Sequence, residues 1–136
     1  MKKIVIVEDD ERLREELKIL LDNNGYEARI LRSFDRAADA LIEMDADLVL
    51  LDIMIPGING QQVLKQLRAK SDVPVIMVTS KNNEVDEVLS MSYGADDYMT
   101  KPYNPTLLLL HIEALFKRIS RQNTMDVYRG VKVNVL

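Results

Sequence analysis

The sequence contains no cysteine, which excludes disulfide bonds, thiol chemistry and thiolate metal sites. It also lacks an apolar run close to the roughly 20 residues that a membrane-spanning helix needs. The apolar stretch at the N-terminus is too short for a signal peptide, and acidic residues follow it at once. A net charge of −4 argues against direct binding of nucleic acid, because phosphate contacts need clustered lysine and arginine. We therefore expect a cytoplasmic protein with no membrane partner.

The 136 residues match the size of one compact domain. Short runs of β-branched and other apolar residues alternate with stretches whose apolar residues recur at helical spacing, which is typical of a parallel sheet with helices on both faces. The expected strands are residues 4–7, 27–30, 48–51, 75–78 and 97–100. The expected helices are residues 11–23, a helix through 37–44 that Ser33 caps, one through 63–67, 84–93 and 106–119.

The tail follows a different pattern. Residues 121–126 are polar and linker-like, and Val131, Val133 and Val135 then alternate with polar residues as in a half-buried strand. Because an unpaired strand is a liability, this tail is either a frayed terminus or the first strand of a following domain. We favour the second interpretation, with one domain at residues 1–120 and a linker plus the start of another domain at residues 121–136.

Polar residues follow the ends of four expected strands. They are Glu8, Asp9 and Asp10 after the first strand, Asp52 after the third, Thr79 and Ser80 after the fourth, and Lys101 after the fifth. In an open parallel sheet, ligands bind at these carboxyl ends. Singly, each residue has an ordinary structural explanation, since an acidic run often only stabilises a helix N-terminus. Together they indicate one acceptor surrounded by the groups that its chemistry needs.

Several carboxylates at one edge of a sheet repel each other unless a cation is present. Oxygen ligands without nearby histidine or cysteine favour a hard ion, and Mg²⁺ is the expected one. Mg²⁺ takes only one or two protein carboxylates and leaves room for a phosphate oxygen. Lys101 adds a positive charge, and Thr79 offers a hydroxyl that can bond a phosphoryl oxygen. The pattern therefore predicts a site that receives a phosphoryl group.

Four motifs resemble those of the receiver domain of two-component response regulators. They are residues 5–10, 50–57, 78–80 and 94–103, and the resemblance covers about residues 2–120. It implies a flavodoxin-like (βα)5 doubly wound parallel sheet with strand order 2-1-3-4-5. It also implies a signalling switch rather than an enzyme, whose only reactions are its own phosphorylation by a sensor histidine kinase and its own dephosphorylation.

Carried over by position, the resemblance assigns the phosphoryl group to Asp52. It implies that Asp9 binds Mg²⁺ directly and Glu8 through a water, while the backbone carbonyl of Met54 completes the protein ligands. With Asp52 itself, these residues form the expected metal site.

The same resemblance implies that Thr79 and Lys101 hold the phosphoryl oxygens. Tyr98 is then the aromatic residue that turns inward when Thr79 moves, and the bond before Pro102 is cis. The expected outcome is a shift in population that changes the surface of the fourth helix, fifth strand and fifth helix.

Residues 96–98 and 101–103 resemble the OmpR/PhoB-like subfamily, whose effector is a winged-helix DNA-binding domain, and residues 127–133 resemble the start of that effector. We therefore expect a transcription regulator that binds DNA only through a domain missing from this sequence. In that subfamily the positions of Glu87, Leu107 and His111 usually carry residues that form ion pairs across a dimer. Glu87 and Leu107 depart from this pattern, so a homodimer through the changed surface is expected to depend more on apolar contact.

Three alternatives are weaker. An Mg²⁺-dependent aspartyl phosphatase needs an acid two residues after its nucleophile, where this chain has Met54. A flavin-binding module needs a phosphate-binding loop after the first strand, and the acidic run there would repel the phosphate. A stand-alone or degenerate receiver that acts through protein binding is the remaining alternative, and all the chemical positions of a working receiver are filled.

Overall fold

The structure is a computed structural model that describes the backbone of residues 1–129 and the side chains of residues 1–122. The chain divides into two units, Met1–Tyr103 and Asn104–Leu136. None of the helices in the described part of the chain is both long and apolar enough to cross a membrane.

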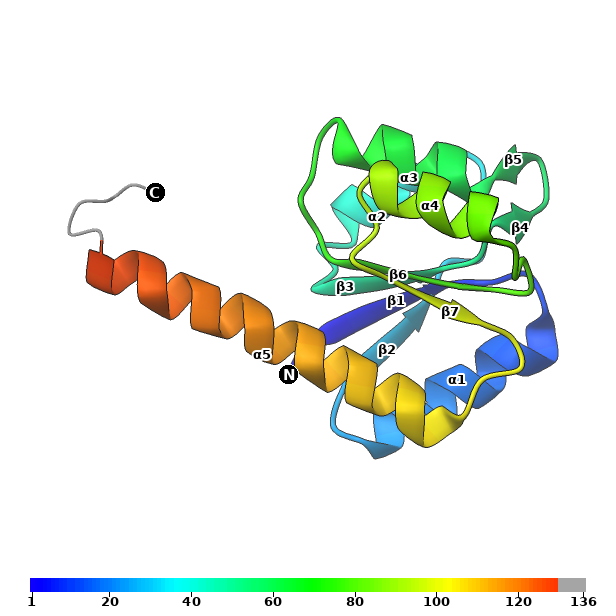
Figure 1. Cartoon of the computed structure of the whole chain (residues 1–136). Coiled ribbons are helices and arrows are strands. Elements are labelled where there is room, and N and C mark those ends of the chain that lie inside the picture. Colours follow the sequence, from blue (N-terminus) through cyan, green and yellow to red (C-terminus); the bar gives the residue numbers. More distant parts are fainter. Residues whose placement is uncertain (130–136) are drawn as a thin grey trace. The chain divides into compact units, whose positions relative to one another are not determined.

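The first unit is built on a five-stranded parallel sheet (Figure 1). Its strands are β1 (Lys3–Val7), β2 (Glu27–Ile30), β3 (Leu48–Leu51), β6 (Val75–Thr79) and β7 (Asp97–Thr100). They lie in the order β2-β1-β3-β6-β7, which is the predicted order 2-1-3-4-5 for the parallel strands. Within this unit, α1 (Glu11–Asn23) lies on one side of the sheet, and α2 (Ala37–Glu43), α3 (Gly60–Arg68) and α4 (Glu84–Ser92) lie on the other. The doubly wound prediction is confirmed.

The central strands are apolar at nearly every position because helices cover both faces of the sheet. Alternate residues of each strand point to opposite faces. One set packs in a single buried cluster with side chains of α2 and α3: Val5, Val7, Val49, Leu51, Val75 and Met77 from the strands, and Leu41, Val63, Leu64 and Leu67 from the helices. Burial of this cluster holds the strand ends, and the polar residues that follow them, in fixed positions.

The start of α2 differs from the prediction. The helix begins at Ala37, after Arg36 in a left-handed conformation with φ of 55°, and Ser33 does not cap it. Ser33 has the right chemistry for a cap, but the buried residues of the helix begin only at Ala37 and Ala38. The helix therefore starts where burial starts, and the cap preference of an earlier residue is overridden.

In the second unit, α5 (Pro105–Arg129) continues past the predicted end at residue 119, so the linker-like residues 121–126 are helical. The segment is polar, but it contains neither glycine nor proline to end a helix. The start of α5 has its expected form, because the Asn104 side chain accepts hydrogen bonds from the backbone of Thr106 and Leu107. The strand predicted at residues 131–135 lies outside the described residues.

The loop after β3 contains a small antiparallel hairpin that was not predicted, formed by β4 (Met54–Ile55) and β5 (Ile58–Asn59). The hairpin leads into Gly60, the first residue of α3. A Cβ atom on Gly60 would lie only 2.0 Å from the backbone oxygen of Asp52. The Gly60 N–H also donates to the backbone oxygen of Ile53, at 2.7 Å. Only glycine lets α3 begin this close to the chain that carries Asp52.

Substitution Gly60→Ala should lower the free energy of unfolding by about 1–3 kcal/mol, because the new methyl group collides with rigid backbone and not with a flexible side chain. Urea unfolding of the folded chain measures this loss. The matched control is Gln62→Ala on the exposed side of the same helix, which should stay within about 0.5 kcal/mol of wild type. Equal stabilities of the two variants would contradict the close approach at Gly60.

Candidate functional site

Strand register brings the predicted site residues to one edge of the sheet. Val7 of β1 pairs with Leu51 of β3, so the next residues, Glu8 and Asp52, leave neighbouring strands at the same level. The Asp52 N–H donates to the Val7 oxygen at 3.1 Å. On the other side, the N–H of Lys101 donates to the oxygen of Thr79 at 2.8 Å. Four residues from distant parts of the sequence therefore follow the carboxyl ends of adjacent strands.

The centre of this edge is an ion triad formed by Glu8, Asp52 and Lys101. The Lys101 Nζ atom lies 2.7 Å from Asp52 Oδ2 and 2.5 Å from Glu8 Oε1. Glu8 is 3% exposed and Asp52 4% exposed. Buried charges are tolerated only when they are paired, and here two carboxylates share one ammonium group. The triad therefore carries an excess negative charge where it is shielded from water.

Burial and pairing act in opposite directions on these groups. Burial raises the pKa of Glu8 above its ordinary value, against the opposing effect of its hydrogen bond from Lys101. Burial lowers the pKa of Lys101, but the hydrogen bonds to Asp52 and Glu8 outweigh it, and the pKa ends above its ordinary value. The lysine therefore stays cationic beside the two carboxylates.

Backbone N–H groups fix the remaining carboxylate oxygens. The N–H of Asp10 donates to Glu8 Oε2, and the N–H of Met54 donates to Asp52 Oδ1, both at 3.1 Å. In each carboxylate, one oxygen accepts a hydrogen bond from a backbone N–H and the other accepts one from Lys101. The backbone therefore fixes the orientation of both carboxylate groups, and Asp52 is oriented without a bound ligand.

Asp9 and Asp10 do not join the triad. Both are exposed, and the Asp10 side chain caps α1 by accepting from the N–H of Leu13 at 3.1 Å. Within the described residues, no three histidine, cysteine or acidic side chains gather as metal ligands. The structure therefore brings together Glu8, Asp52 and Lys101, and leaves Asp9 at the solvent side of them.

Thr79 and Tyr98 meet at the backbone of Lys81. Thr79 is fully buried, and its Oγ1 accepts from the Lys81 N–H at 3.3 Å. Tyr98 is half-buried, and its hydroxyl donates to the Lys81 oxygen at 2.6 Å. Burial, together with the charges of Asp86, Glu87 and Asp52, raises the pKa of Tyr98 to about 12, so the hydroxyl stays a donor. The bond between Lys101 and Pro102 is cis.

Sequence analysis missed two parts of this arrangement. Lys81 contributes through its backbone, so its residue type gives no signal of the role. Gly60 did carry a signal, because a glycine at the first position of a helix directly after a turn indicates a close backbone approach. The sequence did not indicate what Gly60 approaches.

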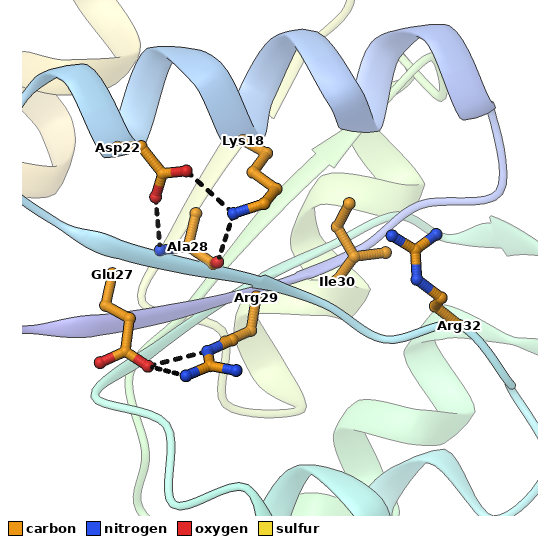
Figure 2. Close-up of a pocket in the computed structure, with 7 residues that line it drawn as sticks. All are labelled: Lys18, Asp22, Glu27, Ala28, Arg29, Ile30 and Arg32. Atoms are coloured by element: carbon orange, nitrogen blue, oxygen red, sulfur yellow. Dashed lines mark hydrogen bonds and ion pairs between the residues drawn. The ribbon is translucent and has the colours of Figure 1, made fainter.

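A separate hollow lies between α1 and the edge strand β2 (Figure 2). Its charged side chains largely neutralise one another. Lys18 contacts Asp22 at 2.9 Å and the Ala28 oxygen at 3.1 Å, and Arg29 contacts Glu27 at 2.6 Å. Charged residues of this kind protect an edge strand from pairing with other chains. Arg32 also lines the hollow and contacts Glu15 at 3.9 Å, so each of the three basic side chains has an acidic partner.

The sequence is similar to those of known proteins. The family described as "Response regulator receiver domain" matches residues 4–113. "Sensory transduction protein RegX3" of Mycobacterium tuberculosis is 46% identical over 118 residues, which are 87% of this chain and 52% of that protein. "DNA-binding response regulator MtrA" of Mycolicibacterium smegmatis is 42% identical over 117 residues, 86% of this chain and 51% of that protein. The chain spans about half the length of these curated relatives.

Solved structures give the same result. The BeF3-activated receiver domain of Klebsiella pneumoniae RstA superimposes with a TM-score of 0.79 at 33% identity, covering 83% of this chain and 97% of that one. The receiver domain of the TMAO respiratory regulator TorR also gives 0.79 at 33% identity, covering 88% and 99%. Both similarities extend over most of the chain.

The raised pKa of Glu8 predicts a pH dependence. The folded chain holds this proton more tightly than the unfolded chain, whose Glu8 titrates near 4.5. The contribution of Glu8 to the unfolding free energy is thus greatest below pH 4.5 and falls as the pH rises towards the raised pKa and through it. Glu8→Gln lacks this titrating group, so its free energy of unfolding should rise relative to that of wild type as the pH increases.

Urea unfolding at a series of pH values in EDTA measures this difference, with exposed Glu43→Gln as the control for loss of one charge. A difference between Glu8→Gln and wild type that does not change from below pH 4.5 to neutral pH would contradict the raised pKa.

Proposed function

The chain belongs to the response regulator receiver domain family, and from this premise we propose that it is a signalling switch that accepts a phosphoryl group on Asp52. The observation that carries the proposal is the pair formed by buried Asp52 and half-buried Lys101, 2.7 Å apart at the carboxyl edge of the sheet. Asp52 is a nucleophile, and the ammonium group of Lys101 can pair with the negative charge of the incoming group.

In the proposed reaction, a carboxylate oxygen of Asp52 attacks the phosphorus of the donor. A P–O bond to Asp52 forms, and the bond from phosphorus to the donor atom breaks, with its electron pair leaving on the donor. In a sensor histidine kinase that atom is a ring nitrogen of phosphohistidine. Lys101 lies close enough to Asp52 to pair with the phosphoryl oxygens, and the hydroxyl of Thr79 is the second proposed contact.

The chemistry of the site fits Mg²⁺. The available donors are all oxygen, and two buried carboxylates face only one ammonium group, so a hard cation would balance the charge. Glu8, Asp9, Asp52 and the backbone carbonyl of Met54 are the proposed ligands. One or two carboxylates suffice, because Mg²⁺ retains several waters. When bound, Mg²⁺ would neutralise charge on the phosphoryl oxygens.

Lys81 provides a physical route from the site to the surface. Thr79 and Tyr98 both bond its backbone, so a Thr79 hydroxyl drawn to the phosphoryl group would release the Lys81 N–H. The Lys81 backbone could then shift, and Tyr98, which bonds the oxygen of the same residue, would lose its fixed acceptor and turn inward. This change favours a second state of α4 and β7, which is a population shift driven by the new phosphoryl contacts.

The proposed partners follow from the family. They are a sensor histidine kinase as donor, and a second copy of the chain through α4, β7 and α5. On α4, Val85 and Val88 are 67% and 59% exposed, and on α5 Leu107 and Leu110 are 47% and 54% exposed, which supports apolar contact in such a dimer. In a longer protein, we propose that residues 1–120 control a winged-helix domain that starts after residue 120 and binds DNA. Transcription would then be the output.

Substitution Asp52→Asn should abolish phosphorylation by acetyl phosphate in Mg²⁺, because an amide oxygen is a far weaker nucleophile than a carboxylate. Intact mass of the chain, measured with and without EDTA, detects the added phosphoryl group. The control is Asp72→Asn, an exposed aspartate that should leave uptake unchanged. An adduct that persists in Asp52→Asn would identify another acceptor, and no adduct in folded wild type would exclude uptake from this donor.

Substitution Asp9→Ala should weaken binding of Mg²⁺ at least about tenfold, since loss of even an indirect metal partner costs 10- to 100-fold in affinity. A Mg²⁺ titration followed by calorimetry measures the dissociation constant. Glu11→Ala removes the same charge from an exposed position in the first turn of α1, and only long-range attraction should change. Equal dissociation constants in the two variants would remove Asp9 from the metal site.

A further inference from the structure

Helix α4 has a polar attachment to the rest of its unit. Among the residues of α4, only Ser90 is fully buried. Three of its four large apolar residues, Val85, Val88 and Met91, are 67%, 59% and 43% exposed, and only Leu89 is half-buried. By contrast, α3 buries Val63, Leu64 and Leu67 completely. A helix with so little buried apolar surface opens more readily than the core, and its position depends on the polar contacts that it makes.

Gln61 of α3 makes those contacts. Its Nε2 atom lies 3.2 Å from the backbone oxygen of Asp86, 3.3 Å from Asp86 Oδ1 and 3.2 Å from Ser90 Oγ. Gln61 is buried, at 9% exposed, so water does not readily replace its hydrogen bonds. We call these three hydrogen bonds the Gln61 bridge. The bridge joins α3 to two successive turns of α4.

The backbone of Gln61 lies next to a close approach between α3 and the chain that carries Asp52. Gln61 follows Gly60, whose Cα has no room for a side chain because the Asp52 backbone oxygen lies against it. The Gln61 N–H donates to the Asn59 side chain at 2.6 Å, which holds the first turn of α3 in place. The bridge therefore extends from a part of α3 that is packed closely against the Asp52 backbone to a helix that buries little apolar surface.

We propose that Gln61 is a positioning residue that holds α4 in its resting place and thereby restrains the switch. The proposal rests on the proposed function, because it concerns the helix whose movement follows phosphorylation of Asp52. For α4 to move away from α3, Ser90 Oγ and the Asp86 oxygens must give up the same amide donor in a site with little water. The strength of the bridge thus sets part of the balance between the resting and active states.

The chain offers a matched pair for the test, since Gln61 and Gln62 are neighbours in α3 and only Gln61 is buried. Methionine preserves the length of glutamine and removes its hydrogen bonds. Hydrogen–deuterium exchange of the folded chain, without phosphodonor, is compared for Gln61→Met, Gln62→Met and wild type. In Gln61→Met, amides of residues 84–92 should exchange about tenfold faster, with β1 and β3 unchanged, and Gln62→Met should match wild type.

The second measurement is the initial rate of phosphoryl uptake from acetyl phosphate in Mg²⁺. A chain whose α4 is released occupies the active arrangement more often, so Gln61→Met should be phosphorylated several times faster than Gln62→Met. A general loss of stability would instead speed exchange throughout the sheet and would not raise the rate of uptake. Ser90→Ala removes one acceptor of the bridge without touching α3, and it should show the same two effects at smaller size.

Unchanged exchange of α4 in both Gln61→Met and Ser90→Ala overturns the bridge. If α4 exchanges faster but the rate of phosphoryl uptake is unchanged, the bridge does not restrain phosphorylation of Asp52. If wild type and the variants all lack a phosphoryl adduct, the proposed function fails, and the role of Gln61 in the switch fails with it. The exchange measurement still decides whether Gln61 holds α4.

Discussion

Two buried carboxylates that share one ammonium group are the constraint on which the rest of this structure depends. Glu8 and Asp52 are almost fully shielded from water, and Lys101 contacts both. Removing the lysine would leave like charges unpaired in a site of low dielectric, which proteins do not tolerate at low cost. The fold must therefore deliver residues 8, 52 and 101 to one point, and the parallel register of β1, β3, β6 and β7 does so.

The site is rigid on the side of Asp52 and adjustable on the side of α4. Backbone bonds orient the Asp52 carboxylate, and Gly60 seats α3 directly against the chain that carries it. In contrast, α4 exposes most of its apolar residues and is hydrogen-bonded to Gln61, and Lys81 bonds both Thr79 and Tyr98. The proposed switch needs this asymmetry, because the proposed acceptor must keep its geometry while another element changes place.

Charge also separates the site from the rest of the surface. Beside β2, lysine and arginine pair with aspartate and glutamate, so that the edge strand is protected without excess charge. At the triad, the negative charge exceeds the positive charge by one. An excess of this sign is consistent with a site that takes up a cation before it takes up an anion.

The sequence by itself determined the five parallel strands, their order by resemblance to a family, and the positions of Asp52, Thr79 and Lys101 at strand ends. These follow from local periodicity, since apolar runs mark strands and the residue after each run must emerge at the sheet edge. Other expectations were wrong or incomplete because tertiary packing, and not local sequence, decides the feature. Ser33 did not cap α2, the tail did not leave the helix at residue 121, and the hairpin at residues 54–59 went unrecognised. Only the tertiary structure decided that Lys101 pairs with both Glu8 and Asp52, that Asp9 stays in solvent, and that Gln61 rather than Gln62 reaches α4. Those contacts join residues far apart in the chain, and their geometry depends on backbone packing that no local pattern encodes.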